Sequence, residues 1–493
     1  MSEGAHELAA AGYAWEMADA PILHSDLTLV DLAHILELSR LGEVPGEAAQ
    51  SLLRELLAMV GSTSQSVDYD PALGEPYLAR ENHLVERVGA AGGWLRAGRT
   101  RREAVRTAYR MVVRRTLLDL VDAGVATLDA LAQQGARHAA TLAPDHTYLQ
   151  VAEPTTFGHY LLSFADALAR DLERLQAEFA HVNRSPSGSG SVAGSAVLQD
   201  RERLGRLLGF DGPIAQVRDG MWQTDPFVHA LASATTLVLG LDGLAEDLEI
   251  LTSAEFALVK LGDGLVRTSV AMPQKRNPYA LTVIRGTAGT LVGRTTGQLA
   301  LSKSPSARSD PSIYAYGEVP RSLELAARAT ALVAAVLRTL EVDEDRMALS
   351  AATPGMAASA IATLLMRHDG LDYLTAHTVV RRAVTDAGGV IGIDDLRRWT
   401  HEVTGATTSL SEQDLEAAAD PRQAVESRDV LGGSSWRAVT EHAATVAARS
   451  AELRDWATST RARIEVAERD VVELARGALG GERPADREQG GAG

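Results

Sequence analysis

The sequence predicts an all-α protein built around a central bundle of very long helices. Alanine, leucine, valine and arginine dominate the 493 residues and only 4% of residues are aromatic, which favours helices over sheets. Apolar residues recur at three- and four-residue spacing over unusually long stretches. No strand–turn–strand pattern stands out beside them, so we expect almost no sheet.

The first half of the chain contains three such stretches. Residues 27–60 predict two amphipathic helices that are separated by the sequence GEVPG. Residues 102–142 predict a helix of unusual length, and residues 155–182 predict another long one. The Gly/Ser-rich residues 183–196 must then form a loop.

The second half starts with the most apolar helix. Residues 225–261 are apolar on more than one face, which places them in the centre of a bundle or of an oligomer built from bundles. Residues 283–303 continue helically, and shorter helices are expected beyond Ala351. We therefore predict four parts: an N-terminal helical domain (1–98), a central long-helix bundle domain (99–350), a small C-terminal helical domain (351–478) and a disordered tail (479–493).

Composition excludes several classes of function. A formal net charge of -17 argues against nucleic-acid and anionic-membrane partners. The absence of cysteine excludes disulfides, thiolate metal sites and cysteine nucleophiles. No uncharged apolar run of 18 residues and no signal-peptide pattern is visible. We expect a cytoplasmic protein.

Two polar stretches flank the longest predicted helix. The stretch RAGRTRRE (residues 96–103) places four arginines at a helix start, where cations oppose the helix dipole. Composition alone fits a solvated helix start equally well, but the placement suggests a grip on carboxylates together with free backbone amides. The stretch DHTYLQVAEPTTFGHY (residues 145–160) gathers hydroxyl, amide and imidazole groups, although a lone histidine is more often a packing or capping residue.

A third stretch, TSVAMPQKRNP (residues 268–278), combines Ser269, Lys275 and Asn277. The serine can act as a base only if cations and amide donors lower its pKa, and the lysine can supply such a charge. A capped turn before a helix explains the same residues equally well. The Gly/Ser-rich loop lacks the strand and lysine of a phosphate loop, and HExxH, GxSxG and paired-carboxylate signatures are missing. A metal site is therefore possible but has no support in these motifs.

These stretches match the motifs of one enzyme family. TSVAMPQKRNP resembles the GSSxMPxKxNP signature of the aspartase/fumarase superfamily. RAGRTRRE resembles the HTGRSRND of its argininosuccinate lyase branch, and HTYLQVAEPTTFGH resembles that branch's YTHLQ.AQPVTFGH. LLGFDG, LAEDLEILTSAEF and DPRQAVESRDVLGG also have near-equivalents there, so the resemblance runs from about Tyr13 to Ala478.

The resemblance implies three domains per subunit and a homotetramer around a twenty-helix core, with each active site built from three subunits. It also implies anti β-elimination from a substituted succinate, a small dicarboxylate, which releases fumarate without metal or cofactor. Removing the weakly acidic proton creates a doubly charged aci-carboxylate, so cations and amide dipoles must already be in place to stabilise it.

The matching positions carry expected roles. Ser269 would be the base on a flexible loop, and Lys275 and Asn277 would stabilise the aci-carboxylate. The succinyl carboxylates would be held by Thr147, Thr100 and Arg101, with support from Gln150.

The sequence departs from the family around the departing group. The family's second signature serine is Val270 and its preceding glycine is Thr268. The histidine and glutamate that assist departure of the leaving group are Tyr148 and Thr282, so both members of that pair are lost. Tyr148 could still donate a proton, since the reference pKa of tyrosine is near 10. Alternatively, the leaving group departs as a stable anion and needs little help.

The rest of the leaving-group end is also rebuilt. Arg102 replaces the asparagine of SRND, and Tyr77 replaces the histidine of the branch's EDIH. The three positions that grip the arginine half of argininosuccinate align with Arg308, Ile313 and Tyr316, and SDRD becomes QTDP at residues 223–226. The substrate-binding candidates at this end are therefore Arg102, Arg308 and Tyr77. Added arginines, Arg267 included, hint at a leaving group that is smaller or more acidic than arginine.

Three functions stay open at this point. The leading one is a fumarate-releasing lyase that acts on another N-substituted aspartate or on nitrosuccinate. The second is a true argininosuccinate lyase with a drifted site. The third is a non-catalytic homologue like the lens crystallins, against which the retained Ser269 and Lys275 argue.

Overall fold

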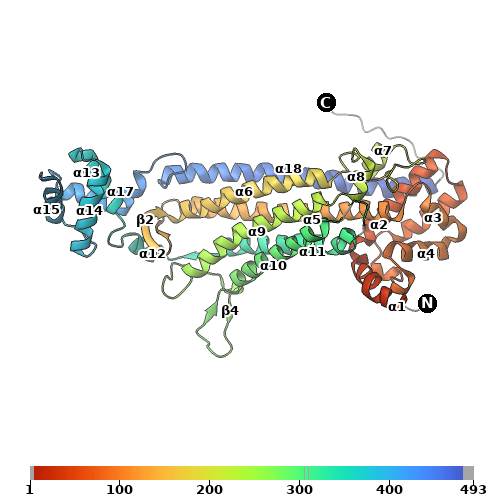
Figure 1. Ribbon diagram of the computed structural model, residues 1–493, viewed down its shortest axis with the longest axis horizontal. Helices are drawn as coiled ribbons and strands as arrows, with labels where there is room; N and C mark the ends of the chain where they lie inside the picture. The colour runs from red at the N-terminus through yellow and green to blue at the C-terminus, as the bar shows by residue number, and fades with distance from the viewer. Residues whose placement is uncertain (1–4, 305, 309, 481–493) are drawn as a thin grey trace.

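The computed structural model describes residues 5–304, 306–308 and 310–480, and in this part the chain is all-α with three two-stranded sheets (Figure 1). Its helices are α1 (Ala5–Leu8), η1 (Ala9–Tyr13), α2 (Ala14–Leu41), α3 (Gly46–Met59), η2 (Ser64–Ser66), η3 (Pro71–Leu73), α4 (Pro76–Val88), η4 (Gly89–Arg96), α5 (Arg101–Arg137), α6 (Phe157–Val182), α7 (Arg201–Leu207), α8 (Val217–Trp222), α9 (Asp225–Leu251), η5 (Asp263–Leu265), α10 (Tyr279–Ser302), α11 (Asp310–Thr339), α12 (Glu344–Ala351), α13 (Ala358–Asp369), α14 (Tyr373–Ala387), α15 (Ile393–Thr404), α16 (Glu412–Ala419), α17 (Pro421–Glu426) and α18 (Trp436–Leu479). Its strands are β1 (Leu142–Thr147), β2 (Gln150–Thr156), β3 (Val259–Lys260), β4 (Arg267–Thr268), β5 (Arg276–Asn277) and β6 (Glu341–Val342).

The long helices form an elongated bundle with α5 at its centre, packed against α2, α6, α11 and α18 (Figure 1). Glycines on α5 let α6 approach closely. A Cβ on Gly124 would lie 2.3 Å from Leu172 of α6, and one on Gly135 would lie 2.7 Å from Leu162. The all-α prediction with a central bundle of long helices is confirmed.

Most predicted helices are present. The break at GEVPG is confirmed, because α2 ends before Gly42, whose φ is +74°, and α3 starts after Pro45. The predicted helix over residues 225–261 is too long, since α9 ends at Leu251. Thr252 Oγ1 donates to the Glu249 carbonyl at 2.9 Å, and Ser253 Oγ accepts from the Phe256 N–H at 3.4 Å. Such local side-chain bonds to the backbone compete with helix continuation.

The expectation of no strand–turn–strand pattern is wrong for residues 267–277, where β4 and β5 pair antiparallel, and for residues 142–156. There β1 and β2 pair antiparallel, with Thr147 opposite Gln150. The two turn residues, Tyr148 and Leu149, have φ values of +54° and +59°. Turns of this kind usually contain glycine or asparagine, so the sequence carries no hairpin signal here.

A small second hydrophobic core lies at the end of the bundle opposite the N-terminal helices. Helices α13 to α16 gather there around residues such as Leu365, Val379 and Leu396 (Figure 1). Beyond them, the 44-residue α18 runs back along α5 and α6 within the predicted C-terminal domain, which contradicts the expectation of shorter helices beyond Ala351. The division at residues 98, 350 and 478 stays a prediction, and residues 481–493 of the predicted tail lie outside the described residues.

Helix α9 is the most apolar long helix of the bundle. Among the described residues it is the one helix that could cross a membrane by length and composition, and 56% of its most apolar window is buried. It packs against α6, α10 and α11, which is the environment of a core helix in a bundle. Its composition alone is therefore weak evidence for a membrane span.

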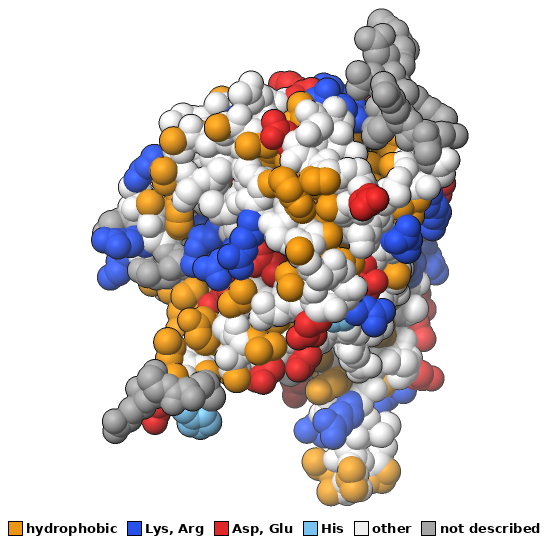
Figure 2. Space-filling model, turned by 90° about the vertical axis from the view of Figure 1, so that its right-hand side faces the viewer, with side chains coloured by type: hydrophobic (Ala, Val, Ile, Leu, Met, Phe, Trp, Pro, Cys, Tyr) orange, Lys and Arg blue, Asp and Glu red, His pale blue; other side chains and the backbone are white. Residues whose placement is uncertain are grey.

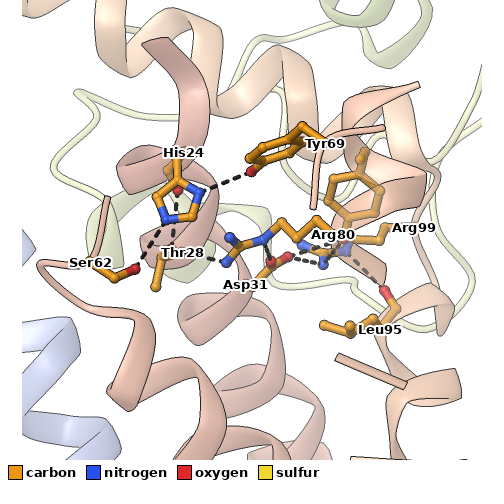
Figure 3. Close-up of polar contacts among 9 residues, drawn as sticks. His24, Thr28, Asp31, Ser62, Tyr69, Arg80, Leu95 and Arg99 are labelled. Atoms are coloured by element: carbon orange, nitrogen blue, oxygen red, sulfur yellow. Dashed lines mark hydrogen bonds and ion pairs between the residues drawn. The ribbon is translucent and has the colours of Figure 1, made fainter. Parts of the chain in front are cut away.

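A buried ionic cluster joins the N-terminal helices to the start of α5 (Figure 3). Asp31 on α2 accepts from Arg80 Nε at 2.8 Å, from Arg99 and from the Tyr77 hydroxyl at 3.1 Å. Burial alone would raise the pKa of Asp31, but Arg99 and Arg80 hold that pKa below its usual range. Because Arg99 directly precedes Thr100, the cluster fixes the loop that leads into α5.

Replacing Asp31 by asparagine should lower the free energy of unfolding by about 3–5 kcal/mol, because Arg80 and Arg99 would stay buried without their carboxylate. Urea unfolding monitored by circular dichroism would measure this loss. The control is Glu324→Gln, which breaks the exposed pair with Arg328 on α11 and should cost less than about 1 kcal/mol. A loss below 1 kcal/mol for Asp31→Asn would contradict the anchoring role.

Candidate active site

The first group of predicted site residues lies at the start of α5. Thr100 caps the helix: its Oγ1 accepts from the Glu103 N–H at 3.4 Å and donates to the Gly190 carbonyl at 3.2 Å. Arg101 is exposed and pairs with Glu75 at 2.9 Å. The guanidinium of Arg102 lies 6.0 Å from the centre of the Trp222 ring. The helix start thus combines a hydroxyl, two cations and the positive end of a long helix.

The Gly/Ser-rich loop at residues 183–196 packs against this helix start. The carboxylate of Glu103 accepts from the N–H of Gly188 at 2.8 Å and from that of Gly190 at 2.6 Å. Gly190 has a φ of +60°, and a Cβ there would lie 2.8 Å from the Gly194 carbonyl, so the loop needs glycine. The sequence shows only a superficial likeness of this loop to a phosphate cradle and carries no signal that pairs the loop with Glu103.

Burial raises the pKa of Glu103 to about 7, although the two N–H donors and Arg99 oppose the shift. Since this folded-state pKa lies above the usual value of 4.5, the folded state binds more protons than the unfolded state between about pH 4.5 and 7. The contribution of Glu103 to stability is therefore fully present below pH 4.5 and is lost as the pH rises through about 7.

Thermal unfolding from pH 5 to 8 would test this titration. The midpoint of the wild type should fall over this range more steeply than that of Glu103→Gln, which cannot ionise. Glu324→Gln, on the exposed surface of α11, is the control and should keep the wild-type slope. Identical slopes for Glu103→Gln and the wild type would contradict a titration of Glu103 near neutral pH.

The second group lies at the tip of the β1–β2 hairpin. Thr147, Tyr148 and Gln150 are exposed, and Tyr148 is 99% exposed. Large side chains in the left-handed region are uncommon and cluster at functional sites. Because it is almost fully exposed, the Tyr148 side chain does not pack against the bundle of its own chain.

The third group lies on the β4–β5 hairpin, which projects from the bundle (Figure 1). Ser269 Oγ accepts from the Met272 N–H at 3.1 Å, and the Ser269 N–H donates to the Lys275 carbonyl at 3.3 Å. Asn277 Nδ2 donates to the Arg267 carbonyl at 2.9 Å, which ties the two strands together.

The tip of this hairpin is apolar. Val270 is fully exposed and Met272 is 44% exposed, and Figure 2 shows hydrophobic side chains at the end of the segment that hangs below the body. Lys275 is exposed as well. The loop therefore has a serine with one amide donor, a nearby lysine and an apolar tip suited to contact with another surface.

Residues of the leaving-group end meet at a cavity between α2, α4, α5 and α11. Arg102, Tyr77, Ile313 and Tyr316 line it together. The Tyr77 hydroxyl is already bound, because Arg99 Nη2 donates to it at 2.6 Å and it donates to Asp31, so Tyr77 can offer the cavity only its ring. Arg308 is exposed and is not among the lining residues.

The acidic residues of this cavity, Glu16, Asp19 and Glu75, are not among the predicted site residues. Burial raises the pKa of Glu16, and neighbouring Glu75 adds to the effect. Asp19 pairs with Arg321 at 2.7 Å. Glu75 lies in the segment that aligns with EDIH, two residues before Tyr77. Glu16 and Asp19 belong to no motif, so only their position in the fold assigns them to the site.

The three groups do not meet in one chain. Thr100 and the β1–β2 hairpin lie at opposite ends of α5, whose 37 residues span roughly 55 Å. The β4–β5 hairpin lies in a third place, below the bundle (Figure 1). Within the described ranges, no group of three or more histidine or carboxylate side chains could hold a metal ion. The roles of the site residues, and the expectation that no metal or cofactor takes part, stay predictions.

Comparison with known proteins places the chain in a family. A protein-family model described as a lyase matches residues 55–293. The chain is 30% identical to the argininosuccinate lyase of Methanoculleus marisnigri over 462 residues, which cover 93% of this chain and 94% of the relative. It is 32% identical to that of Haloarcula marismortui over 472 residues, which cover 93% and 92%.

A solved structure of EDDS lyase in complex with formate superposes with a TM-score of 0.86 at 25% identity, covering 97% of this chain and 95% of that one. A variant of the same enzyme with bound fumarate gives the same values. The predicted resemblance is confirmed: the chain belongs to the aspartase/fumarase superfamily, as an argininosuccinate lyase-like carbon–nitrogen lyase.

Proposed function

We propose that this lyase forms fumarate by anti β-elimination from a substituted succinate, with Ser269 as the base. The observation that carries the proposal is the β4–β5 hairpin. It holds a serine whose hydroxyl oxygen accepts an amide hydrogen bond, with Lys275 and Asn277 on the same loop. The relatives named argininosuccinate lyase and the neighbour with bound fumarate support the same chemistry.

The geometry suits proton abstraction in two respects. An N–H donor at 3.1 Å favours the ionised form of Ser269, and a cation on the same loop acts in the same direction. Ser269 would take the proton from the carbon beside one carboxylate, and the electron pair of the broken C–H bond would delocalise into that carboxylate. This pair then forms the C=C bond of fumarate while the C–N bond breaks and its pair leaves with the departing group. The hydroxyl of Tyr148 would supply a proton to that group where it needs one.

We infer a homotetramer with shared active sites, because the candidate residues lie in three places of one chain. The exposed faces of α9 and α10 fit such an assembly. They carry Leu239, Val283, Val292 and Leu299, each between 39% and 55% exposed, and Gly286, Gly289, Gly293 and Gly297, where a Cβ would contact nothing. A face that is rich in small and apolar residues is suited to close packing against other copies of the chain. A cytoplasmic location fits this enzyme and stays an expectation.

The proposed substrate is an N-substituted aspartate other than argininosuccinate, or nitrosuccinate. Tyr148 and Thr282 stand where the branch has its departure-assisting pair, and Arg102, Ile313 and Tyr316 line the cavity at the rebuilt end. A true argininosuccinate lyase is the second candidate, which the curated relatives at 30% and 32% identity favour.

Purified enzyme separates these possibilities. The forward assay follows fumarate by its ultraviolet absorbance with argininosuccinate, nitrosuccinate and a series of N-substituted aspartates. The reverse assay mixes fumarate with amines, amino acids or nitrite and detects adducts by mass spectrometry. Efficient cleavage of argininosuccinate alone would establish the second candidate. The absence of fumarate from every succinyl compound would refute the proposed reaction, with Ser269→Ala as the background in each assay.

A further inference from the structure

A second cavity lies next to the leaving-group end, between α5, α9, α10 and α11. Arg106, Tyr109, Gln298 and Tyr316 line it, together with apolar and small polar side chains. These four side chains are buried, with exposed fractions of 3% for Arg106, 1% for Tyr109, 5% for Gln298 and 6% for Tyr316. The space holds about one water-sized group, so only the end of a ligand fits.

Two hydroxyl groups at this cavity have no hydrogen-bond partner within the described part of the chain. They belong to Tyr109 and Tyr316, whose rings pack edge to face with centres 5.0 Å apart. Buried hydroxyl groups are normally satisfied because burying an unpaired one is costly. Two such groups at one cavity point to a ligand that accepts hydrogen bonds.

Two buried arginines lie at this cavity or beside it. Arg110, one turn beyond Arg106 on α5, donates to the carbonyls of His181 at 3.0 Å and Val182 at 2.9 Å and to the side-chain oxygen of Gln223. All three acceptors are neutral. Burial and the nearby Arg106 lower the pKa of Arg110 to about 9, and the more weakly acting Asp225 and Asp219 oppose the shift. A buried arginine such as Arg110, whose three acceptors are neutral, favours an anion nearby.

The two cavities share part of their lining. Tyr316 lines both, and Arg102 of the first lies one helical turn before Arg106 of the second on α5. A group that leaves the succinate at the first cavity can therefore place its far end in the second.

We propose that Arg106, with the hydroxyls of Tyr109 and Tyr316, binds a small planar oxyanion at the end of the leaving group. This deepens the proposed function and rests on it. A carboxylate of an amino-acid leaving group and nitrite share this chemistry, since each presents two oxygens to the guanidinium and the two hydroxyls. Arg106 lies three positions beyond the end of RAGRTRRE, the stretch that resembles the family motif, so no motif residue corresponds to it.

Binding can be measured without any turnover. Thermal unfolding of the full chain at constant ionic strength would compare sodium nitrite and sodium acetate with sodium chloride. Nitrite or acetate should raise the unfolding temperature in a saturable way, and more than chloride. The Tyr109→Phe/Tyr316→Phe double variant should weaken the apparent affinity at least about tenfold. It should unfold no earlier than the wild type without added anion, because it loses no hydrogen bond.

Two further variants sharpen the result. Arg106→Gln should abolish the anion effect. Tyr69→Phe removes a partly buried hydroxyl that contacts His24 at 2.9 Å far from the cavity, so it should keep the wild-type anion effect. An unchanged anion effect in the double tyrosine variant, no effect in the wild type at 100 mM, or an equal effect of chloride would each overturn the oxyanion site.

The reverse reaction identifies the source of the oxyanion. With fumarate as co-substrate, Tyr316→Phe should raise the KM for nitrite if nitrite is the leaving group, or the KM for the amino acid if an amino acid is, and leave the KM for fumarate unchanged. If no adduct forms with either compound while anion binding still depends on Arg106, the proposed reaction fails and the anion site stands.

Discussion

Replacing Ser269 by alanine should reduce fumarate formation by about 10²–10⁴-fold, which is the usual contribution of a positioned base. The fold should not change, because the Ser269 hydroxyl contacts the nearby Met272 N–H on a loop that projects from the bundle. The loss should appear in kcat, since the serine is expected to act on the proton in the transition state and to contribute little to substrate affinity.

Steady-state kinetics on the best substrate from the forward assay, together with thermal unfolding, would check this result. Ser163→Ala is the matched control, because its exposed hydroxyl donates to the Tyr160 carbonyl at 2.7 Å on α6. That variant should keep full activity. A Ser269→Ala enzyme within threefold of the wild-type rate would show that another group removes the proton.

The fold was largely predictable, because helix signals are local. Apolar residues at three- and four-residue spacing correctly predict most of α2, α5, α6 and α10. The predictions of secondary structure fail where local side-chain and turn conformations, and not the spacing of apolar residues, decide the backbone. Tyr148 and Leu149 form a two-residue turn without glycine, and Thr252 and Ser253 end α9 through bonds to the backbone.

The residues of the candidate site could be predicted from the sequence only where they belong to a recognisable motif. Ser269, Lys275 and Asn277 share one stretch, so a single signature finds them all. The residues that position or extend the site have partners far away in sequence. Glu103 contacts a loop 85 residues later, and Arg106 shares a cavity with Tyr316, on a different helix. No window of the sequence contains both members of such pairs, so they become visible only in three dimensions.

A second expected result addresses the sharing of sites between subunits. Ser269→Ala and Arg101→Gln enzymes should each be nearly inactive, but a one-to-one mixture should recover about a quarter of the wild-type activity. A site is intact when the copy that supplies Ser269 and the copy that supplies Arg101 both carry the native residue, and each condition holds for half of the copies. The variants would be co-expressed from two differently tagged genes and assayed for fumarate.

Mixing the wild type with a double Ser269→Ala/Arg101→Gln variant gives a matched control. If Ser269 and Arg101 come from different copies, this mixture also retains about a quarter of the activity, since both native residues again meet in a quarter of the sites. If each chain contained its own complete site, the control would retain about half, and the mixture of single variants would recover nothing. The roughly 55 Å length of α5 and the separate position of the β4–β5 hairpin favour the first outcome. Recovery of activity in the single-variant mixture would thus show that Ser269 and Arg101 of one active site come from different copies of the chain.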